Sequence, residues 1–401
     1  MKKRLWKLVV SIALVSIFLI GCGNKSTDTT APTKKPEVKT SDGTGQKEPG
    51  ASDTNGQGTA ETDAQKLAGE LLTRNITKND IVTEEVITEL IKELKVKYQF
   101  EKLNDFKVAS AEWVYVADGK GWLKDLYGDN GTKVSIVEGT IGNEAQLMER
   151  NELHISSRML YPYLIYKSKG AQISAIQISE RPSPEIVTVL VNAKSDINSF
   201  EDLKGKKIGS WNAGCQYVAL IERTEDLGWE EGKDWTYINV SNDGLKTALV
   251  AGELDAISVH PLTSFNSSII DGSLREIANA AQDGTYVNNG GASVFFSPTE
   301  FAEENTSILK AFLKLREAIV SYILDNEEEA AKVVEGITRV PAENTIFWWE
   351  RSKETFFASS DTLENLKTGT AKYQDWLVEH GTISPADVID ADEFFLETYF
   401  K

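Results

Sequence analysis

The chain is poor in cysteine and histidine and carries far more acidic than basic side chains. It has two cysteines, three histidines and a formal net charge of −18 over 401 residues. Such an acidic chain is unsuited to nucleic acid, whose phosphates are neutralised by Lys and Arg. The histidines His154, His260 and His380 show no metal-ligand spacing, so no metal is expected. No Gly-x-Ser-x-Gly elbow, phosphate-binding loop or dinucleotide fingerprint is present, so the common enzyme signatures are missing.

Long hydrophobic runs are also missing. The apolar stretch Leu8 to Ile20 has 13 residues, which is short for a membrane-spanning helix. It follows a basic start and ends in Leu-Ile-Gly-Cys22, which resembles the lipobox of bacterial lipoproteins. We therefore expect residues 1–22 to be a lipoprotein signal peptide and Cys22 to be lipidated. The alternative is an uncleaved anchor helix. Either reading places the protein outside the cytoplasmic membrane and attached to it.

The next segments differ sharply in composition. Residues 23–63 are rich in Thr, Gly, Lys, Asp, Ser and Pro, which predicts a disordered tether that buries too little surface to fold. Residues 64–104 carry apolar side chains at helical spacing and predict a helical extension. These helices either pack on the main domain or mediate contact with a partner.

Strands and helices alternate in the remainder. Strands are predicted over 106–116, 134–137, 153–157, 173–179, 186–191, 207–210, 237–240, 254–259, 274–278 and 292–296. Helices are predicted over 121–127, 142–148, 161–168, from 215, over 242–252, 308–324, 328–336, around 347–357 and over 363–380. This order indicates an α/β class with mostly parallel sheets and flanking helices.

Residues 199–216 are the most informative stretch. A strand over 207–210 runs into the loop Trp211 to Gly214, and a helix starts at Cys215. Ligands of open α/β sheets bind at the carboxyl ends of strands, where helix N–H groups also attract anions. The alternative is an ordinary strand–helix turn. Cys215 is either a thiol whose pKa the helix start lowers or simply a small buried residue.

From about Lys107 onward, the order of elements resembles the substrate-binding proteins of ABC importers, in the nitrate/sulfonate/taurine branch. The resemblance rests on Asp-Gly-Lys-Gly-Trp-Leu at 118–123, Asp-Leu-Lys-Gly-Lys-Lys-Ile-Gly at 202–209, and Asp-Gly-Leu-Lys-Thr-Ala-Leu at 243–249 followed by Gly-Glu-Leu-Asp-Ala at 252–256. It implies a two-lobed periplasmic-binding-protein-like fold of type II. Lobe one would be 105–192 plus 287–401, and lobe two 193–286, with the ligand in a cleft that closes by a hinge motion.

The resemblance also implies a set of ligand-binding positions: Trp113, Gly142, Asn143, Ser157, Arg158, Trp211, Asn212, Ala213, Gly214, Cys215, His260, Gly290 and Gly291. Trp113 either stacks on the ligand or packs in the core. Arg158 and His260 depart from the family pattern, since small and acidic residues usually stand there. A cleft arginine suits a carboxylate, sulfonate or phosphonate, although Arg158 could instead face solvent or pair with an acid.

Together these features predict a lipid-anchored, monomeric binding component that captures a small organic anion, sulfonate-like or carboxylate, without a cofactor. Its partners would be an ABC permease with its ATPase, and the membrane through the lipid on Cys22. One alternative is a sensing or scaffold lipoprotein of the same fold. Another is an enzyme of the pyrimidine-synthesis type, for which Cys215 with His260 is the one nucleophile–base pair to test.

Overall fold

The computed structural model describes residues 61–180, 187–212, 214–260, 263–279, 293–353, 357 and 363–400. From Ala60 onward the chain forms one compact unit. The predicted signal peptide, Cys22 and the tether up to residue 60 lie outside the described residues. Among the helices that are described, none has the length and apolar character needed to cross a membrane.

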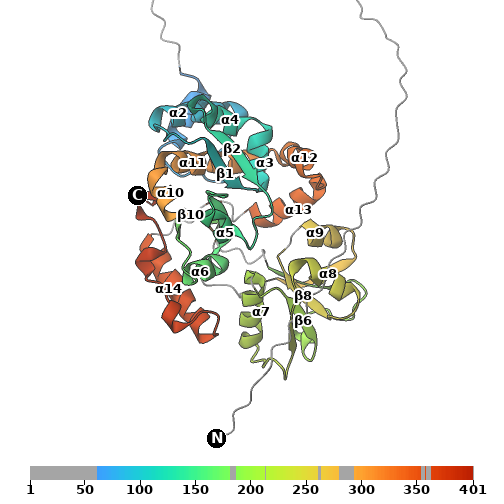
Figure 1. The fold of residues 1–401 in the computed structure, drawn as a ribbon. Coiled ribbons are helices and arrows are strands. Elements are labelled where there is room, and N and C mark those ends of the chain that lie inside the picture. Colours follow the sequence, from blue (N-terminus) through green and yellow to red (C-terminus); the bar gives the residue numbers. More distant parts are fainter. Residues whose placement is uncertain are drawn as a thin grey trace, which may run out of the picture. The chain divides into compact units, whose positions relative to one another are not determined.

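Strands and helices follow one another along the chain as drawn in Figure 1. The strands are β1 (Asp105–Ala109), β2 (Lys133–Val137), β3 (Ser156–Met159), β4 (Ile173–Glu180), β5 (Thr188–Asn192), β6 (Lys207–Ser210), β7 (Thr236–Asn239), β8 (Ala256–Val259), β9 (Leu274–Asn279) and β10 (Ser293–Pro298). The helices are α1 (Asp63–Leu71), α2 (Glu84–Lys97), α3 (Glu112–Gly119), α4 (Trp122–Tyr127), α5 (Glu144–Glu149), α6 (Leu160–Ser168), α7 (Cys215–Asp226), α8 (Asn242–Val250), α9 (Thr263–Ile270), α10 (Thr299–Glu304), α11 (Thr306–Asp325), α12 (Glu327–Thr338), α13 (Ala342–Ser352) and α14 (Leu363–Glu379).

The described strands form three sheets, in the orders β1-β2, β3-β10-β4 and β7-β6-β8-β5-β9. We call the elements around the first two sheets the first lobe, and β5 to β9 with α7 to α9 the second lobe. β1-β2, β6-β7 and β6-β8 are parallel, whereas β10 and β5 run antiparallel to their neighbours. The sheets are therefore mixed, which corrects the expectation of mostly parallel sheets, because hydrophobic pattern does not encode strand direction.

Two predicted boundaries are also wrong. Strand β5 was expected in lobe one, but it pairs with β8 and β9 in the sheet of the second lobe. The strand predicted over 106–116 ends at Ala109, and helix α3 begins at Glu112. All four residues from Val114 to Ala117 are buried. A short apolar run of this kind fits a buried helix as well as a buried strand, so the pattern alone could not separate them.

The helical extension belongs to the core of the first lobe. Leu71, Ile87, Leu90 and Leu94 of α1 and α2 are fully buried and share one hydrophobic cluster with α3, α4 and α11. Figure 1 shows α2, α4 and α11 gathered beside β1 and β2. The first of the two alternatives for this segment, packing on the main domain, therefore describes the structure.

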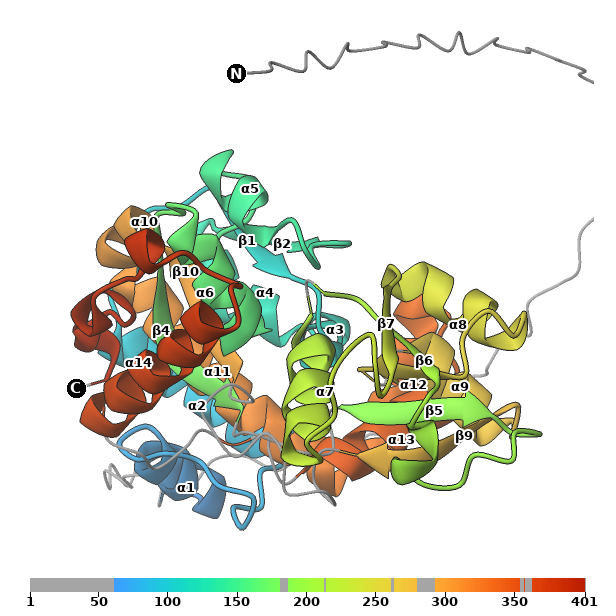
Figure 2. The ribbon, with the colours of Figure 1, turned by 90° about the horizontal axis from the view of Figure 1, so that it is seen from below.

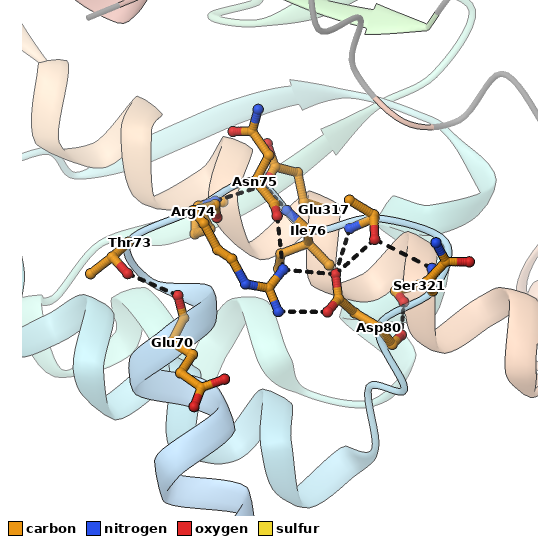
Figure 3. Close-up of polar contacts among 11 residues, drawn as sticks. Glu70, Thr73, Arg74, Asn75, Ile76, Asp80, Glu317 and Ser321 are labelled. Atoms are coloured by element: carbon orange, nitrogen blue, oxygen red, sulfur yellow. Dashed lines mark hydrogen bonds and ion pairs between the residues drawn. The ribbon is translucent and has the colours of Figure 1, made fainter.

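A polar cluster fixes the loop between α1 and α2 onto α11 (Figure 3). The Arg74 guanidinium donates to both carboxylate oxygens of Asp80, at 2.6 and 2.9 Å. Lys314 of α11 donates to the Arg74 carbonyl at 2.8 Å, and the Ser321 hydroxyl donates to the Asp80 carbonyl at 2.5 Å. Buried Glu317 accepts from Lys314 and from Gln177 of β4. The extension is thus joined by polar contacts to the helix and strand at the centre of this lobe.

The C-terminal helices reach the second lobe. Helix α13 lies beside α9 in Figures 1 and 2, and Asn344 donates to the Ser267 hydroxyl at 2.7 Å. Helix α14 shares a hydrophobic cluster with Cys215, Val218 and Ala219 of α7. These contacts hold the ends of β6 and β8 close to the first lobe.

The Arg74–Asp80 pair makes stability sensitive to acid. The hydrogen bonds from Arg74 lower the pKa of Asp80 to about 2. The stabilisation is therefore complete above about pH 4 and is lost as the pH falls towards 2. We expect Asp80→Asn to lower the free energy of unfolding by about 1 kcal/mol at pH 7, with the difference from wild type shrinking below pH 4.

Urea denaturation at several pH values measures this difference. Asp118→Asn is the matched control, since Asp118 is an exposed acid on α3. Equal losses for the two variants at pH 7, or a difference that does not depend on pH, would contradict the prediction.

Candidate ligand-binding site

A cavity of about 550 Å³ is lined by residues of both lobes. The first lobe contributes Trp113, Ser157 and Arg158 among others. The second lobe contributes Trp211, Gly214, Cys215 and His260. The resemblance implies that Ser157 and Arg158 share one ligand cleft with the loop that begins at Trp211. In the structure, Ser157, Arg158 and Trp211 all line this cavity.

Arg158 is held in place by a buried carboxylate. It lies on β3 opposite Val294 of β10, and its Nε is 3.3 Å from Oε1 of Glu144. Glu144 is fully buried, and its Oε2 accepts from the Gly142 N–H at 2.9 Å and from the Tyr166 hydroxyl at 2.6 Å. Both readings of Arg158 therefore hold in part, because it pairs with an acid while it lines the cavity. Three contacts to Glu144 restrict the orientation in which Arg158 meets a ligand.

Aromatic rings form much of the wall. Trp113 stands on α3 and not at a strand end, and its ring lies 6.2 Å from that of Phe295 and perpendicular to it. It also lies 5.0 Å from the Phe312 ring, so it both packs in the core and lines the cavity. Trp348 and Trp349 of α13 line the same space. The wall therefore offers large apolar faces next to the Arg158 guanidinium.

Gly142 allows a close approach between the lobes. Its φ of +87° is favourable only for glycine, and a Cβ at this position would stand 3.4 Å from the Trp211 ring. The Trp211 side chain therefore packs against the loop whose N–H group binds Glu144. Nearby, the Tyr161 hydroxyl of α6 donates to the Asn212 carbonyl at 2.8 Å. Gly142 and Asn212 thus join the lobes and are not among the residues that line the cavity.

Cys215 and His260 lie side by side. Cys215 is the first residue of α7, after β6, and His260 follows β8, which pairs with β6 in parallel. The carboxyl ends of neighbouring parallel strands meet at one edge of a sheet, which explains the proximity of the two residues. The Cys215 Sγ and the His260 Nε2 are in hydrogen-bonding contact. Cys215 is buried, which agrees with its interpretation as a small buried residue.

The other predicted positions lie elsewhere. Asn143 is the exposed residue before α5, makes no side-chain cap hydrogen bond and is not among the lining residues. Ala213, Gly290 and Gly291 lie outside the described residues. In the described part of the chain, no cluster of three or more His, Cys, Asp or Glu side chains could hold a metal ion.

Sequence reasoning missed several lining residues, which include Ser110, Glu112, Gln216, Asn242, Asn266 and Arg316. Arg316 is 2% exposed, and its guanidinium carbon lies 5.6 Å from the Phe295 ring centroid. The sequence pattern does indicate that Arg316 is unusual, because this arginine interrupts the apolar side of α11 between Leu315 and Ile319. A buried arginine in such a position is rarely found without a function or a partner. Glu112 adds an acidic group to this wall, and desolvation raises its pKa.

Comparisons with known proteins assign the chain to a family. The NMT1/THI5-like family model matches residues 110–330. The chain belongs to the NMT1/THI5-like family. The chain is 24% identical over 270 residues to a Bacillus subtilis protein provisionally named as aliphatic sulfonates-binding, and the match covers 65% of this chain and 76% of that protein. It is 25% identical over 225 residues to a Haemophilus influenzae protein provisionally named for thiamine biosynthesis, covering 54% and 66%.

Solved structures show the fold of the NMT1/THI5-like chain. The alkanesulfonate-binding protein SsuA of Xanthomonas axonopodis pv. citri, bound to MOPS, superposes with a TM-score of 0.62 at 18% identity, over 74% of this chain and 99% of that one. The periplasmic nitrate-binding protein NrtA of Synechocystis PCC 6803 superposes with a TM-score of 0.55 at 14% identity, over 75% and 88%. The fold is that of the periplasmic binding proteins, and the predicted kinship with the sulfonate and nitrate branch is confirmed.

The Glu144–Arg158 pair generates a stability prediction. Glu144→Gln keeps an acceptor for Gly142 and Tyr166 but leaves the partly buried Arg158 charge without its carboxylate. We expect the free energy of unfolding to fall by about 3 kcal/mol, since losing one partner of a buried ion pair leaves the other uncompensated.

Chemical denaturation at pH 7 measures this loss. Glu149→Gln, on the exposed side of the same helix, should unfold like wild type. A Glu144→Gln variant as stable as Glu149→Gln would show that the ion pair does not support this wall.

Proposed function

We propose that the chain is the substrate-binding component of an ABC importer and captures a small organic anion in the cavity shared by its two lobes. A lipid on Cys22 holds it outside the cytoplasmic membrane, and it acts as a monomer that delivers its ligand to a permease. The partner ATPase supplies the energy, so this role requires no reaction of the chain itself. The observation that carries the proposal is Arg158, fixed by Glu144 on a wall where both lobes meet.

The charges of the cavity favour an anion. Arg158 presents a planar guanidinium, which suits the paired oxygens of a carboxylate or sulfonate. The buried Arg316 adds a second cation to the lining. The start of α7 lies on the same wall, where helix N–H groups and the helix dipole also favour negative charge. Glu112 is the acidic residue among the lining side chains of this wall, and desolvation, which raises its pKa, disfavours its charged form.

The size and lining of the cavity favour an anion with an organic body. A volume of about 550 Å³ is far greater than nitrate needs and lies within the range of sites for larger organic ligands. Trp113, Trp211, Trp348 and Trp349 supply apolar faces for such a body. The bound MOPS of the Xanthomonas protein is an organic sulfonate, which supports this choice of ligand class.

Thermal unfolding in the presence of candidate anions tests the proposal. Methanesulfonate, taurine, MOPS, benzenesulfonate, benzoate and nitrate form a panel that separates the head group from the organic body. A ligand that binds only the folded state raises the melting temperature as its concentration exceeds Kd. We expect a sulfonate or carboxylate with a large body to raise it most, and nitrate to raise it least.

Arg158→Gln should weaken the best ligand at least tenfold by calorimetry, because a charge-assisted pair of hydrogen bonds is lost. Arg150→Gln is the control, since Arg150 is exposed and pairs with Glu152. If no compound of the panel stabilises the protein, or if Arg158→Gln binds as tightly as Arg150→Gln does, the proposed function is wrong.

A further inference from the structure

Cys215 and His260 form a nucleophile–base pair on the cavity wall that anion capture does not use. Both line the cavity, and Sγ of the cysteine contacts Nε2 of the histidine. Two parallel strands deliver them, β6 through the start of α7 and β8 directly. Their contact therefore follows from the sheet of the second lobe.

Two features of the position of Cys215 favour the thiolate form, and they act against its burial in a hydrophobic cluster. It opens a helix of 12 residues, and the residue before it, Gly214, has no side chain to cap the helix. Cysteine thiols at helix starts and beside a protonated histidine lose their proton far below the usual pKa of about 8.5. The helix start and the imidazole act on the same sulfur atom here, from two different elements.

Several other described groups also act on the charge of Cys215. Tyr161 of α6 and Tyr373 of α14 interact with it electrostatically, and burial raises the pKa of both phenols, so they stay neutral between pH 5 and 9. The Cys215 thiol donates to Oε1 of Gln216 at 3.9 Å, a weak contact that only the protonated form can make. Glu222, farther along α7, interacts with Tyr373, while Arg158 and Glu112 line the same cavity. Among these groups, the one in hydrogen-bonding contact that can change charge near neutral pH is His260.

We propose that Cys215 is a reactive thiolate and that the cavity is a site of thiol–disulfide exchange with small disulfides. The Cys215 sulfur attacks one sulfur of a disulfide RSSR, forms a new S–S bond and breaks the old one. The leaving thiolate RS⁻ takes the proton of the His260 imidazolium and departs as RSH. The attached S–R group then occupies the cavity, and a free thiol reverses the reaction. Such a step would let the redox state of the surroundings control access to the site.

The first test measures how fast iodoacetamide alkylates the full-length protein between pH 5 and 9. Peptide mass spectrometry distinguishes Cys215 from Cys22, the other cysteine of the chain. We expect the rate at Cys215 to reach half its maximum well below pH 8. In His260→Gln the midpoint should rise by at least one pH unit, so that labelling at pH 6.5 slows about tenfold.

His380→Gln is the matched control, because it removes an imidazole directly after α14 that pairs with Glu225. Its labelling profile should match that of wild type. Circular dichroism tests whether each variant is folded. If His260→Gln is not folded, the pH profile of wild-type labelling alone decides the test. A wild-type midpoint near pH 8.5, or no labelling of the folded protein at any pH, overturns the proposal.

The second test uses bis(2-hydroxyethyl) disulfide, a small neutral probe whose entry does not depend on the charges of the cavity. At pH 7 we expect one hydroxyethylthio group on Cys215, removed by dithiothreitol, and none on a Cys215→Ser variant. If the adduct forms more than tenfold more slowly in His260→Gln, the result supports the Cys215–His260 pair as the cause of the thiol's reactivity. Rapid alkylation without any disulfide adduct refutes the exchange. The result is independent of anion binding, so it stands or falls separately from the proposed function.

Discussion

The position of the Glu144 carboxylate constrains the rest of the site. It is fully buried, and its Oε2 accepts hydrogen bonds from Tyr166 and the Gly142 N–H. Its Oε1 forms an ion pair with Arg158 at 3.3 Å, without the geometry of a hydrogen bond. Burying an ionised carboxylate without such partners would cost several kcal/mol, so the three contacts must form together. They connect α5, α6 and β3, and they set both the orientation of the Arg158 guanidinium and the path of the loop against which Trp211 packs.

The same loop links the two lobes. Trp211 and Asn212 of the second lobe meet Gly142 and Tyr161 of the first, while α13 and α14 pack on α9 and α7. The cavity therefore has walls that belong to different sheets but are joined at several points. An anion held by Arg158 and a thiol adduct on Cys215 would occupy the same cavity.

Much of the local structure was predictable from the sequence. Strand β6 spans the predicted residues 207–210, and α7 begins at Cys215 as expected. Here a polar turn, a short strand and a glycine-containing loop all indicate the same structure, and agreement of this kind makes a prediction reliable. Between residues 106 and 117 the signals conflict, because a buried helix turn and a buried strand have the same apolar composition. Trp113 was for that reason placed on the wrong kind of element.

Less of the candidate site than of the local structure could be predicted from the sequence. The sequence by itself determined that Trp211 follows a strand and that Cys215 starts a helix, because local patterns encode local structure. The strand predicted over 153–157 instead spans Ser156–Met159, so Ser157 and Arg158 lie within β3 and not after it. It could not determine that Glu144 reaches Arg158, that Cys215 meets His260, or that Arg316 faces the cavity. Glu144 and Arg158 are 14 positions apart in the sequence, and Arg158 and Arg316, which line the same cavity, are more than 150 positions apart. Only the packing of sheets and helices in three dimensions brings such residues within reach of one another.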